Sequence, residues 1–365
     1  MQLARVGREG QERLARARVL VVGCGALGTA ACEQLVRGGV GTVSIVDRDL
    51  VDWSNLQRQT LFTEQDARRS VPKAEAAKAR LGAINSAVTV RAFVDDLHAG
   101  NASRYTSPCD CLVDCLDNFE SRLLLNECAV AQGIPLVYGG AVGWTGMAAA
   151  ILPHVPAAEG FGGTLRWPER CATPCLRCLM PDAPAPGETE TCESAGIFGP
   201  VAAIVGAVQA GLVMRLFAEG PESVPAELIR FDFSSLRFTT SSLAGARDEA
   251  CACCARREFP LQLSGSAASR DGCRILCGRN AVEIRLASSG VDLRQIEARL
   301  RVAGEVASGI HGSTEVVRVE LRESAGVDSP RAISILSGEM GLLAIVDGTR
   351  DAEKARSAVA RWVGV

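Results

Sequence analysis

A glycine-rich turn near the start of the chain is the first feature that could do chemistry. The sequence GCGALG at residues 23–28 follows a short β-branched run at 18–22 and precedes helical periodicity at 29–37. Glycines let a backbone approach a phosphate closely, and the first N–H groups of a helix are free to bind it. The pattern therefore predicts a strand, a phosphate-binding turn and a helix that together hold a nucleotide.

A dense polar segment follows the next predicted strand. Asp47 ends the strand at 42–46, at the distance from the turn where an acid meets a ribose hydroxyl. The turn and this acid suit an NAD(P)- or FAD-dependent oxidoreductase as well. However, the segment at 47–59, DRDLVDWSNLQRQ, supplies Asn, Gln and Arg, and Pro72-Lys73 comes soon after. Hydride transfer has no use for these groups, whereas nucleotidyl transfer needs cations aimed at a triphosphate and carboxylates for magnesium.

Three short motifs in order carry a family resemblance. SNLQRQ at 54–59, PK at 72–73 and LDN at 116–118 resemble the ThiF/MoeB branch of the ubiquitin-activating-enzyme superfamily, over roughly residues 10–255. The resemblance implies ATP-dependent adenylation of the C-terminal glycine carboxylate of a ubiquitin-like sulfur-carrier protein ending in Gly-Gly. Pyrophosphate is released, and a sulfur donor protein then completes the thiocarboxylate. A scaffold that only binds the carrier is the non-catalytic alternative.

The resemblance also implies roles for individual residues. Asp47 would bind the ribose, while Asn55 and Arg58 would contact the nucleotide phosphates. Lys73 would neutralise the triphosphate, and Asp117 would ligate Mg²⁺. The expected nucleotide-binding residues are Gly23, Gly25, Ala26, Gly28, Asp47, Ser54, Asn55, Leu56, Gln57, Arg58, Lys73, Asp117 and Asn118.

Cys192 is a further catalytic candidate. The segment TCESAG at 191–196 resembles a family loop whose cysteine lies over the active site and, in some relatives, forms a covalent link to the carrier. A thiolate there is a suitable nucleophile toward an acyl adenylate. An ordinary thiol in a crossover loop is the competing interpretation. We expect Arg58, Lys73, Asp117 and Cys192 to be the catalytic residues.

Two CxxC pairs predict a structural zinc site. Cys175 and Cys178 form one pair, and Cys251 and Cys254 form the other. Such spacing is typical of tetrahedral Zn(Cys)4 sites, which here would tie a Pro- and Gly-rich excursion to the end of the large domain. Cys171 and Cys253 lie nearby and are alternative ligands, although Cys251 and Cys254 match the family's spacing.

The N-terminus departs from the family pattern. Relatives carry an R-Y-x-R-Q element upstream of the position of Gly10, and its arginine reaches the ATP site of the partner subunit. The sequence as printed begins too late for that element. We expect an upstream start codon; otherwise Arg5, Arg8 or Arg13 takes the role, or activity is reduced.

The alternation of strands and helices predicts a Rossmann-like, doubly wound, mostly parallel sheet over residues 1–255. A linker is expected at 256–270 and a small α+β domain at 271–365. This last unit stands where some relatives carry a rhodanese domain. It lacks the cysteine and the Gly- and Arg-bearing loop of a persulfide site, so a partner-docking role is the better expectation.

Composition limits the partners. With 47% hydrophobic and 22% charged residues and a net charge of −3, the chain shows neither a basic nucleic-acid stripe nor a membrane-binding surface. We expect no nucleic acid and no membrane as partners, and a cytoplasmic location, since residues 1–10 lack an apolar signal core. The uncharged stretch at 195–214 contains Pro200, Gln209 and four glycines, which favours a buried helix at a homodimer contact.

Overall fold

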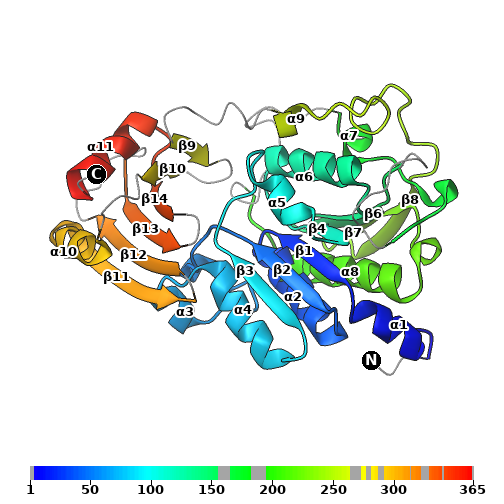
Figure 1. Ribbon diagram of the computed structural model, residues 1–365, viewed down its shortest axis with the longest axis horizontal. Coiled ribbons are helices and arrows are strands. Elements are labelled where there is room, and N and C mark those ends of the chain that lie inside the picture. Colours follow the sequence, from blue (N-terminus) through cyan, green and yellow to red (C-terminus); the bar gives the residue numbers. More distant parts are fainter. Residues whose placement is uncertain are drawn as a thin grey trace.

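The computed structural model describes residues 4–154, 165–181, 195–263, 273–276, 281–286, 292–312, 314–321, 329–338 and 341–363. These residues form an eight-stranded sheet and a six-stranded sheet, which lie on opposite sides of the molecule (Figure 1).

The large sheet has the strand order β3-β2-β1-β4-β5-β6-β7-β8. Its first five strands in this order run parallel, and the last three are added antiparallel. The predicted Rossmann-like sheet is therefore confirmed. The strands are β1 (Arg18–Val22), β2 (Thr42–Val46), β3 (Thr89–Phe93), β4 (Cys111–Asp114), β5 (Leu136–Val142), β6 (Thr145–Ile151), β7 (Glu227–Asp232) and β8 (Arg237–Ser242).

Helices cover both faces of this sheet because the buried strands are apolar on both sides. In β1, Val19 and Val21 pack with one set of helices, whereas Leu20 and Val22 pack with the other. The first set is α2 (Ala26–Gly38), α4 (Lys73–Ile84) and α8 (Gly199–Ala218), and the second includes α5 (Ala102–Thr106) and α6 (Phe119–Gln132). The remaining short helices are α1 (Gly7–Leu14), η1 (Trp53–Asn55), α3 (Glu64–Arg68), η2 (Glu169–Cys171), α7 (Leu176–Leu179), η3 (Pro221–Ser223) and α9 (Pro260–Leu263).

Helix α8 is the apolar segment noted in the sequence. Its length and composition would let it cross a membrane, but 61% of its most apolar window is buried inside the protein. A side chain at Gly206 would lie 2.5 Å from the carbonyl oxygen of Leu27, so glycine permits the close approach of α8 to α2. The buried amide of Gln209 donates to the carbonyl oxygens of Asp114 and Val137, which fixes α8 to the sheet. The expectation of a buried helix fits this packing.

The second sheet is antiparallel, with the strand order β11-β12-β13-β14-β10-β9. Two amphipathic helices, α10 (Leu293–Ala303) and α11 (Ala352–Trp362), cover one of its faces. The strands are β9 (Cys273–Leu276), β10 (Ala281–Leu286), β11 (Gly304–His311), β12 (Thr314–Leu321), β13 (Ala332–Gly338) and β14 (Gly341–Asp347). Of the predicted linker at 256–270, the structure describes the part up to Leu263, which includes α9; residues 264–270 lie outside the described residues.

Candidate functional site

The glycine turn connects β1 to α2 at the carboxyl end of the parallel strands. Gly23 has φ of +90°, a left-handed conformation that favours glycine. A side chain at Gly28 would lie 2.0 Å from the carbonyl oxygen of Gly23, so only glycine lets the helix start so close to the turn. Helix α2 begins at Ala26, which leaves its first N–H groups facing the end of the sheet. The turn thus has the form that a phosphate-binding site requires.

Asp47 follows β2 and lies against this turn. Its carboxylate accepts hydrogen bonds from the backbone N–H groups of Cys24, at 2.6 Å, and Asp49, at 2.7 Å. Burial raises the pKa of Asp47 to about 6, despite the nearby ammonium group of Lys73, which favours the ionised form. The carboxylate retains further lone pairs that can accept ribose hydroxyls. The structure therefore brings the predicted ribose acid and the predicted phosphate turn together.

Lys73 reaches the same place from the first turn of α4. Its Nζ lies 2.8 Å from Oδ2 of Asp49, and the side chain is buried. The backbone is tied to the same segment, because Lys73 N donates to the Asp49 carbonyl oxygen at 2.8 Å and Leu50 pairs with Pro72. Asp49 was not among the residues expected at the site. The repeated acid in the motif Asp47-Arg48-Asp49 was the available signal.

The SNLQRQ loop borders the turn from the other side. Asp52 caps the short helix η1 by accepting from Ser54 N at 2.9 Å. Arg58 donates to the Ser54 carbonyl oxygen at 2.9 Å and is half-buried. A side chain at Gly199 would lie 3.1 Å from the Gln57 carbonyl oxygen, so the start of α8 packs directly on this loop. The loop therefore lies between α8 and the glycine turn.

Gln59 borders the glycine turn but was not among the residues expected there. It is 4% exposed, and its Nε2 would lie 3.9 Å from a side chain at Gly25. Among the described residues, its Oε1 has no hydrogen-bond partner. Its place in the QRQ motif was the signal for it. The amide borders the turn where a nucleotide would contact Gly25.

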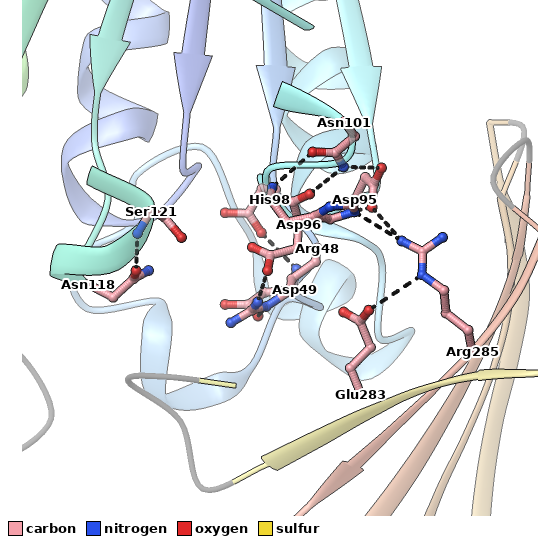
Figure 2. Close-up of polar contacts among 11 residues, drawn as sticks. Arg48, Asp49, Asp95, Asp96, His98, Asn101, Asn118, Ser121, Glu283 and Arg285 are labelled. Atoms are coloured by element: carbon pink, nitrogen blue, oxygen red, sulfur yellow. Dashed lines mark hydrogen bonds and ion pairs between the residues drawn. The ribbon is translucent and has the colours of Figure 1, made fainter. Parts of the chain in front are cut away.

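Asp117 and Asn118 occupy the loop after β4. Asn118 caps α6 by accepting from Ser121 N at 2.9 Å (Figure 2). Asp117 is exposed and lies within electrostatic range of Arg48, which follows Asp47. The strand order places β4 beside β1 and opposite β2, so these loops flank the topological switch point of the sheet. Ligands of open α/β sheets bind in the crevice at such a point.

The loop at 116–118 is anchored by a buried ion pair beneath it. The Arg122 Nε lies 3.0 Å from Oδ2 of Asp114. The same guanidinium donates to the carbonyl oxygens of Leu116, at 2.5 Å, and Gly139, at 3.1 Å, and lies over the ring of Tyr138. These contacts join the loop to β4 and β5, so the polar groups at its tip stand on a rigid base.

Four cysteine sulfurs converge at the other end of α6. Those of Cys175, Cys178, Cys251 and Cys254 all lie within 4.8 Å of one another. Neighbouring pairs are 3.4 to 3.9 Å apart. Sulfurs bound to a tetrahedral zinc ion at ~2.3 Å are about 3.8 Å apart, so the donor set fits Zn²⁺.

The two alternative cysteines are not members of this set of four, although Cys253 packs beside it. Cys253 is buried and its sulfur accepts from Nδ2 of Asn126 at 3.4 Å, while Cys171 is half-buried on η2. Neither belongs to the group of sulfurs within ligand distance in the part of the chain that the structure describes. The geometry therefore favours the pairing of the two CxxC motifs.

The structure does not test Cys192, which lies outside the described residues. The N-terminal arginines lie at the far end of α8: Arg5 pairs with Glu219, and Arg13 donates to the carbonyl oxygen of Phe217. Arg8 pairs with Glu12 on the surface of α1.

The sheet, the turn and the charged loops define a nucleotide-binding protein of the Rossmann-like α/β class. The family model described as "ThiF family" matches residues 1–253. The chain belongs to the ThiF family.

Similar proteins are known by name. The sulfur carrier protein ThiS adenylyltransferase of Bacillus subtilis is 36% identical over 369 aligned positions, which cover 99% of this chain and 97% of that protein. The sulfur carrier protein adenylyltransferase of Thermus thermophilus is 39% identical, covering 70% of this chain and 88% of that protein. A crystal structure of E. coli MccB with ATP has the same fold, with a TM-score of 0.54 and 21% identity over 67% of this chain and 69% of that one.

Proposed function

We propose that this protein adenylates the C-terminal glycine carboxylate of a ubiquitin-like sulfur-carrier protein at the expense of ATP. The observation that carries the proposal is the meeting of the glycine turn, Asp47 and the Lys73–Asp49 ion pair beside the carboxyl ends of β1 and β2. Asp117 lies in the loop after the neighbouring strand β4, within electrostatic range of Arg48. The full-length similarity to a sulfur carrier protein ThiS adenylyltransferase supports the substrate class.

The site residues divide the work of the reaction. The carrier carboxylate attacks the α-phosphate of ATP, an acyl adenylate forms, and pyrophosphate leaves. Asp47 holds the ribose, and the turn with the N-terminus of α2 holds phosphate. Arg58 and Lys73 neutralise the charge that develops on the departing phosphates. An already ionised carboxylate is the nucleophile, so no general base is required.

Metal ions complete the proposal. Asp117 is the carboxylate that would hold Mg²⁺, and the ion when bound with ATP would neutralise charge on the phosphates. Zn²⁺ is assigned to the cysteine cluster, where it would serve structure. Cys192 remains a candidate for a covalent link to the carrier.

The remaining partners and boundaries follow from the same assignment. A sulfur donor protein would deliver sulfide-level sulfur that displaces AMP from the acyl adenylate and so leaves a thiocarboxylate. We propose that the enzyme is a homodimer and acts in the cytoplasm. We place the adenylation domain at 1–255, a linker at 256–270 and a small α+β domain at 271–365. The end of the family match at residue 253 and the start of β9 at Cys273 support this division.

The decisive experiment is ATP–pyrophosphate exchange with a carrier ending in Gly-Gly. Exchange should require that carrier, and a carrier shortened by its last glycine should give none. Nicotinamide absorbance and flavin binding measured on the same preparation test an oxidoreductase directly. A redox signal without exchange would overturn the proposal, and carrier binding without exchange would indicate a scaffold.

A further inference from the structure

The C-terminal sheet has two distinct faces. In β10, Val282 and Ile284 pack against the core beneath α10 and α11. Ala281, Glu283 and Arg285 alternate with them and so point the other way, because successive side chains of a strand face opposite sides. That opposite face lies against the large domain at the ends of β2 and β3 (Figure 2).

Leu50 of the large domain is inserted into this face. It is 6% exposed and belongs to one buried apolar cluster with four residues of the C-terminal sheet, which are Ala281, Val316, Leu336 and Ile345. Val94, which follows β3, packs against the same cluster. The contact is apolar and lies only one residue beyond Asp49.

A polar network extends the contact at its edge. Arg285 lies 3.8 Å from Oδ1 of Asp95 and 3.3 Å from Nε2 of His98 (Figure 2). Asp95 is buried and accepts from Tyr105 Oη at 2.7 Å and from Asn101 Nδ2 at 3.0 Å. The loop after β3 is therefore bonded on one side to its own domain and on the other to β10.

Arg48 is held among carboxylates from both domains. It forms an ion pair of 2.6 Å with Asp96. Burial disfavours its charged form, but Asp96, Asp49 and Glu283 outweigh this effect and keep the pKa of Arg48 above its usual value. Glu283 comes from β10 and is 5% exposed.

The β11–β12 hairpin makes one more contact with the nucleotide-binding part. A side chain at Gly312 would lie 2.3 Å from Oε2 of Glu75, so the tip of the hairpin lies directly on the first turn of α4. That turn carries Lys73. The C-terminal domain therefore touches both segments that meet at the Lys73–Asp49 ion pair.

We propose that the C-terminal sheet is a supporting wall of the nucleotide site, and that Leu336 is a positioning residue within it. Leu336 and Leu50 belong to the same buried cluster. The neighbour of Leu50, Asp49, bonds Lys73, and the backbone of Leu50 itself pairs with Pro72. The wall thereby sets the distance between the ribose acid Asp47 and the phosphate-binding Lys73. This inference rests on the nucleotide-site assignment made above.

The test compares two cavities in the full-length protein. Leu336→Ala empties the face that holds Leu50. Leu342→Ala empties the opposite face, beneath α10 and α11, with the same change of side chain. Both should lower the melting temperature, since each removes a buried leucine. Leu336→Met should restore the contact, because methionine nearly conserves the volume.

Two measurements separate positioning from general destabilisation. In the nucleotide-free protein, amide hydrogen exchange of residues 47–73 should become faster in Leu336→Ala and stay at the wild-type rate in Leu342→Ala. The KM for ATP should rise about tenfold in Leu336→Ala, with kcat little changed, because loosened contacts weaken nucleotide binding. Leu336→Met should behave as the wild type in both.

The inference would be overturned if the two alanine variants changed amide hydrogen exchange and the KM for ATP equally. It would also be overturned if amide hydrogen exchange at residues 47–73 were unchanged in Leu336→Ala. The hydrogen-exchange measurement needs neither carrier nor turnover. A wild-type protein without pyrophosphate exchange activity would therefore refute the proposed function and still leave the positioning result readable.

Discussion

At the scale of single residues, the site is organised around paired charges. Lys73 forms an ion pair with Asp49, and Arg48 forms one with Asp96. A triphosphate must therefore compete with Asp49 for the Lys73 ammonium group. Such pairing keeps a buried cation in place without a ligand, because an isolated buried charge is costly.

Loss of either phosphate-binding cation should slow adenylation. Arg58→Ala or Lys73→Ala is expected to reduce carrier-dependent ATP–pyrophosphate exchange about 100-fold, the usual effect of removing one charge-stabilising group. Lys78→Ala is the matched control, since Lys78 is exposed on the same helix α4 and pairs only loosely, at 3.8 Å, with Glu75. Near-normal exchange in both test variants would remove these residues from the site.

The raised pKa of Asp47 makes nucleotide affinity depend on pH. Ribose hydroxyls donate to the ionised carboxylate, and burial raises the pKa of this group to about 6. The ionised fraction is complete above that value and falls as pH drops through it. Binding of Mg-ATP, followed by calorimetry, should therefore be about tenfold weaker at pH ~5 than at pH ~7.5.

The control for this effect is Asp47→Asn, which cannot titrate. Protonation of ATP itself affects both proteins equally, so the difference between their pH profiles isolates Asp47. The variant should bind ATP weakly at every pH and show a flatter profile. An identical slope in the two proteins would mean that Asp47 does not titrate in contact with the nucleotide.

At the scale of elements, the cysteine cluster joins segments that are distant in sequence. Cys175 directly precedes α7 and Cys178 lies within it, whereas Cys251 and Cys254 follow β8. Asn126 of α6 accepts from Leu176 N at 2.9 Å, and the buried Glu127 binds Arg177 at 3.2 Å. Helix α6 thus fixes the segment that carries the first cysteine pair, and a metal ion would join that pair to the second one.

Purified protein should contain about one zinc per chain. Cys175→Ser or Cys254→Ser should release it and lower the melting temperature, because a structural metal contributes directly to folding. Cys171→Ser is the control, as Cys171 lies outside the cluster. Atomic absorption measures the zinc content of each protein. If both test variants keep all of their zinc, these four cysteines are not the ligands.

Local patterns predicted the elements around the nucleotide site well. Residues 29–37 lie inside α2, and the strand ranges 18–22 and 42–46 are those of β1 and β2. These elements have clear patterns and clear ends, namely the glycine turn after β1 and the glycine after α2. The pairing of Asp47 with the turn was also predictable, because parallel strands end at a common edge.

Contacts between distant segments were not predictable from local patterns. The sequence pattern does not indicate that Leu50 packs on a sheet formed by residues beyond 270. A single apolar residue in a polar loop does not show which distant segment it will contact. Asp49 and Gln59 lie in motifs in which only some residues were given a role. Tertiary packing brings Asp49 to Lys73 and Gln59 to Gly25, and local sequence does not specify these contacts.

At the scale of the whole molecule, helix α8 offers a surface for a second copy of the chain. Its outward stripe is apolar and only partly buried, and it consists of Ile204, Ala207, Val208 and Gly211. A side chain at Gly211 would meet nothing within 4 Å. At the start of the helix, Phe198 stacks on Trp144, which is 53% exposed. Small residues on a helix surface allow close approach of a partner, and apolar stripes favour burial.

We therefore expect a two-fold homodimer formed through this stripe, because a self-complementary patch pairs with its own copy. Light scattering should give twice the chain mass of 38.4 kDa. Ala207→Glu places a charge at the exposed centre of the stripe and should yield monomers, since an unpaired charge is costly to bury at an interface. Ala79→Glu makes the same change on the exposed face of α4 and should leave the dimer intact. If the wild-type protein is a monomer, or if both variants dimerise equally, the stripe on α8 is not the interface. Pyrophosphate exchange measured on the Ala207→Glu monomer then tells whether each nucleotide site works without its neighbour.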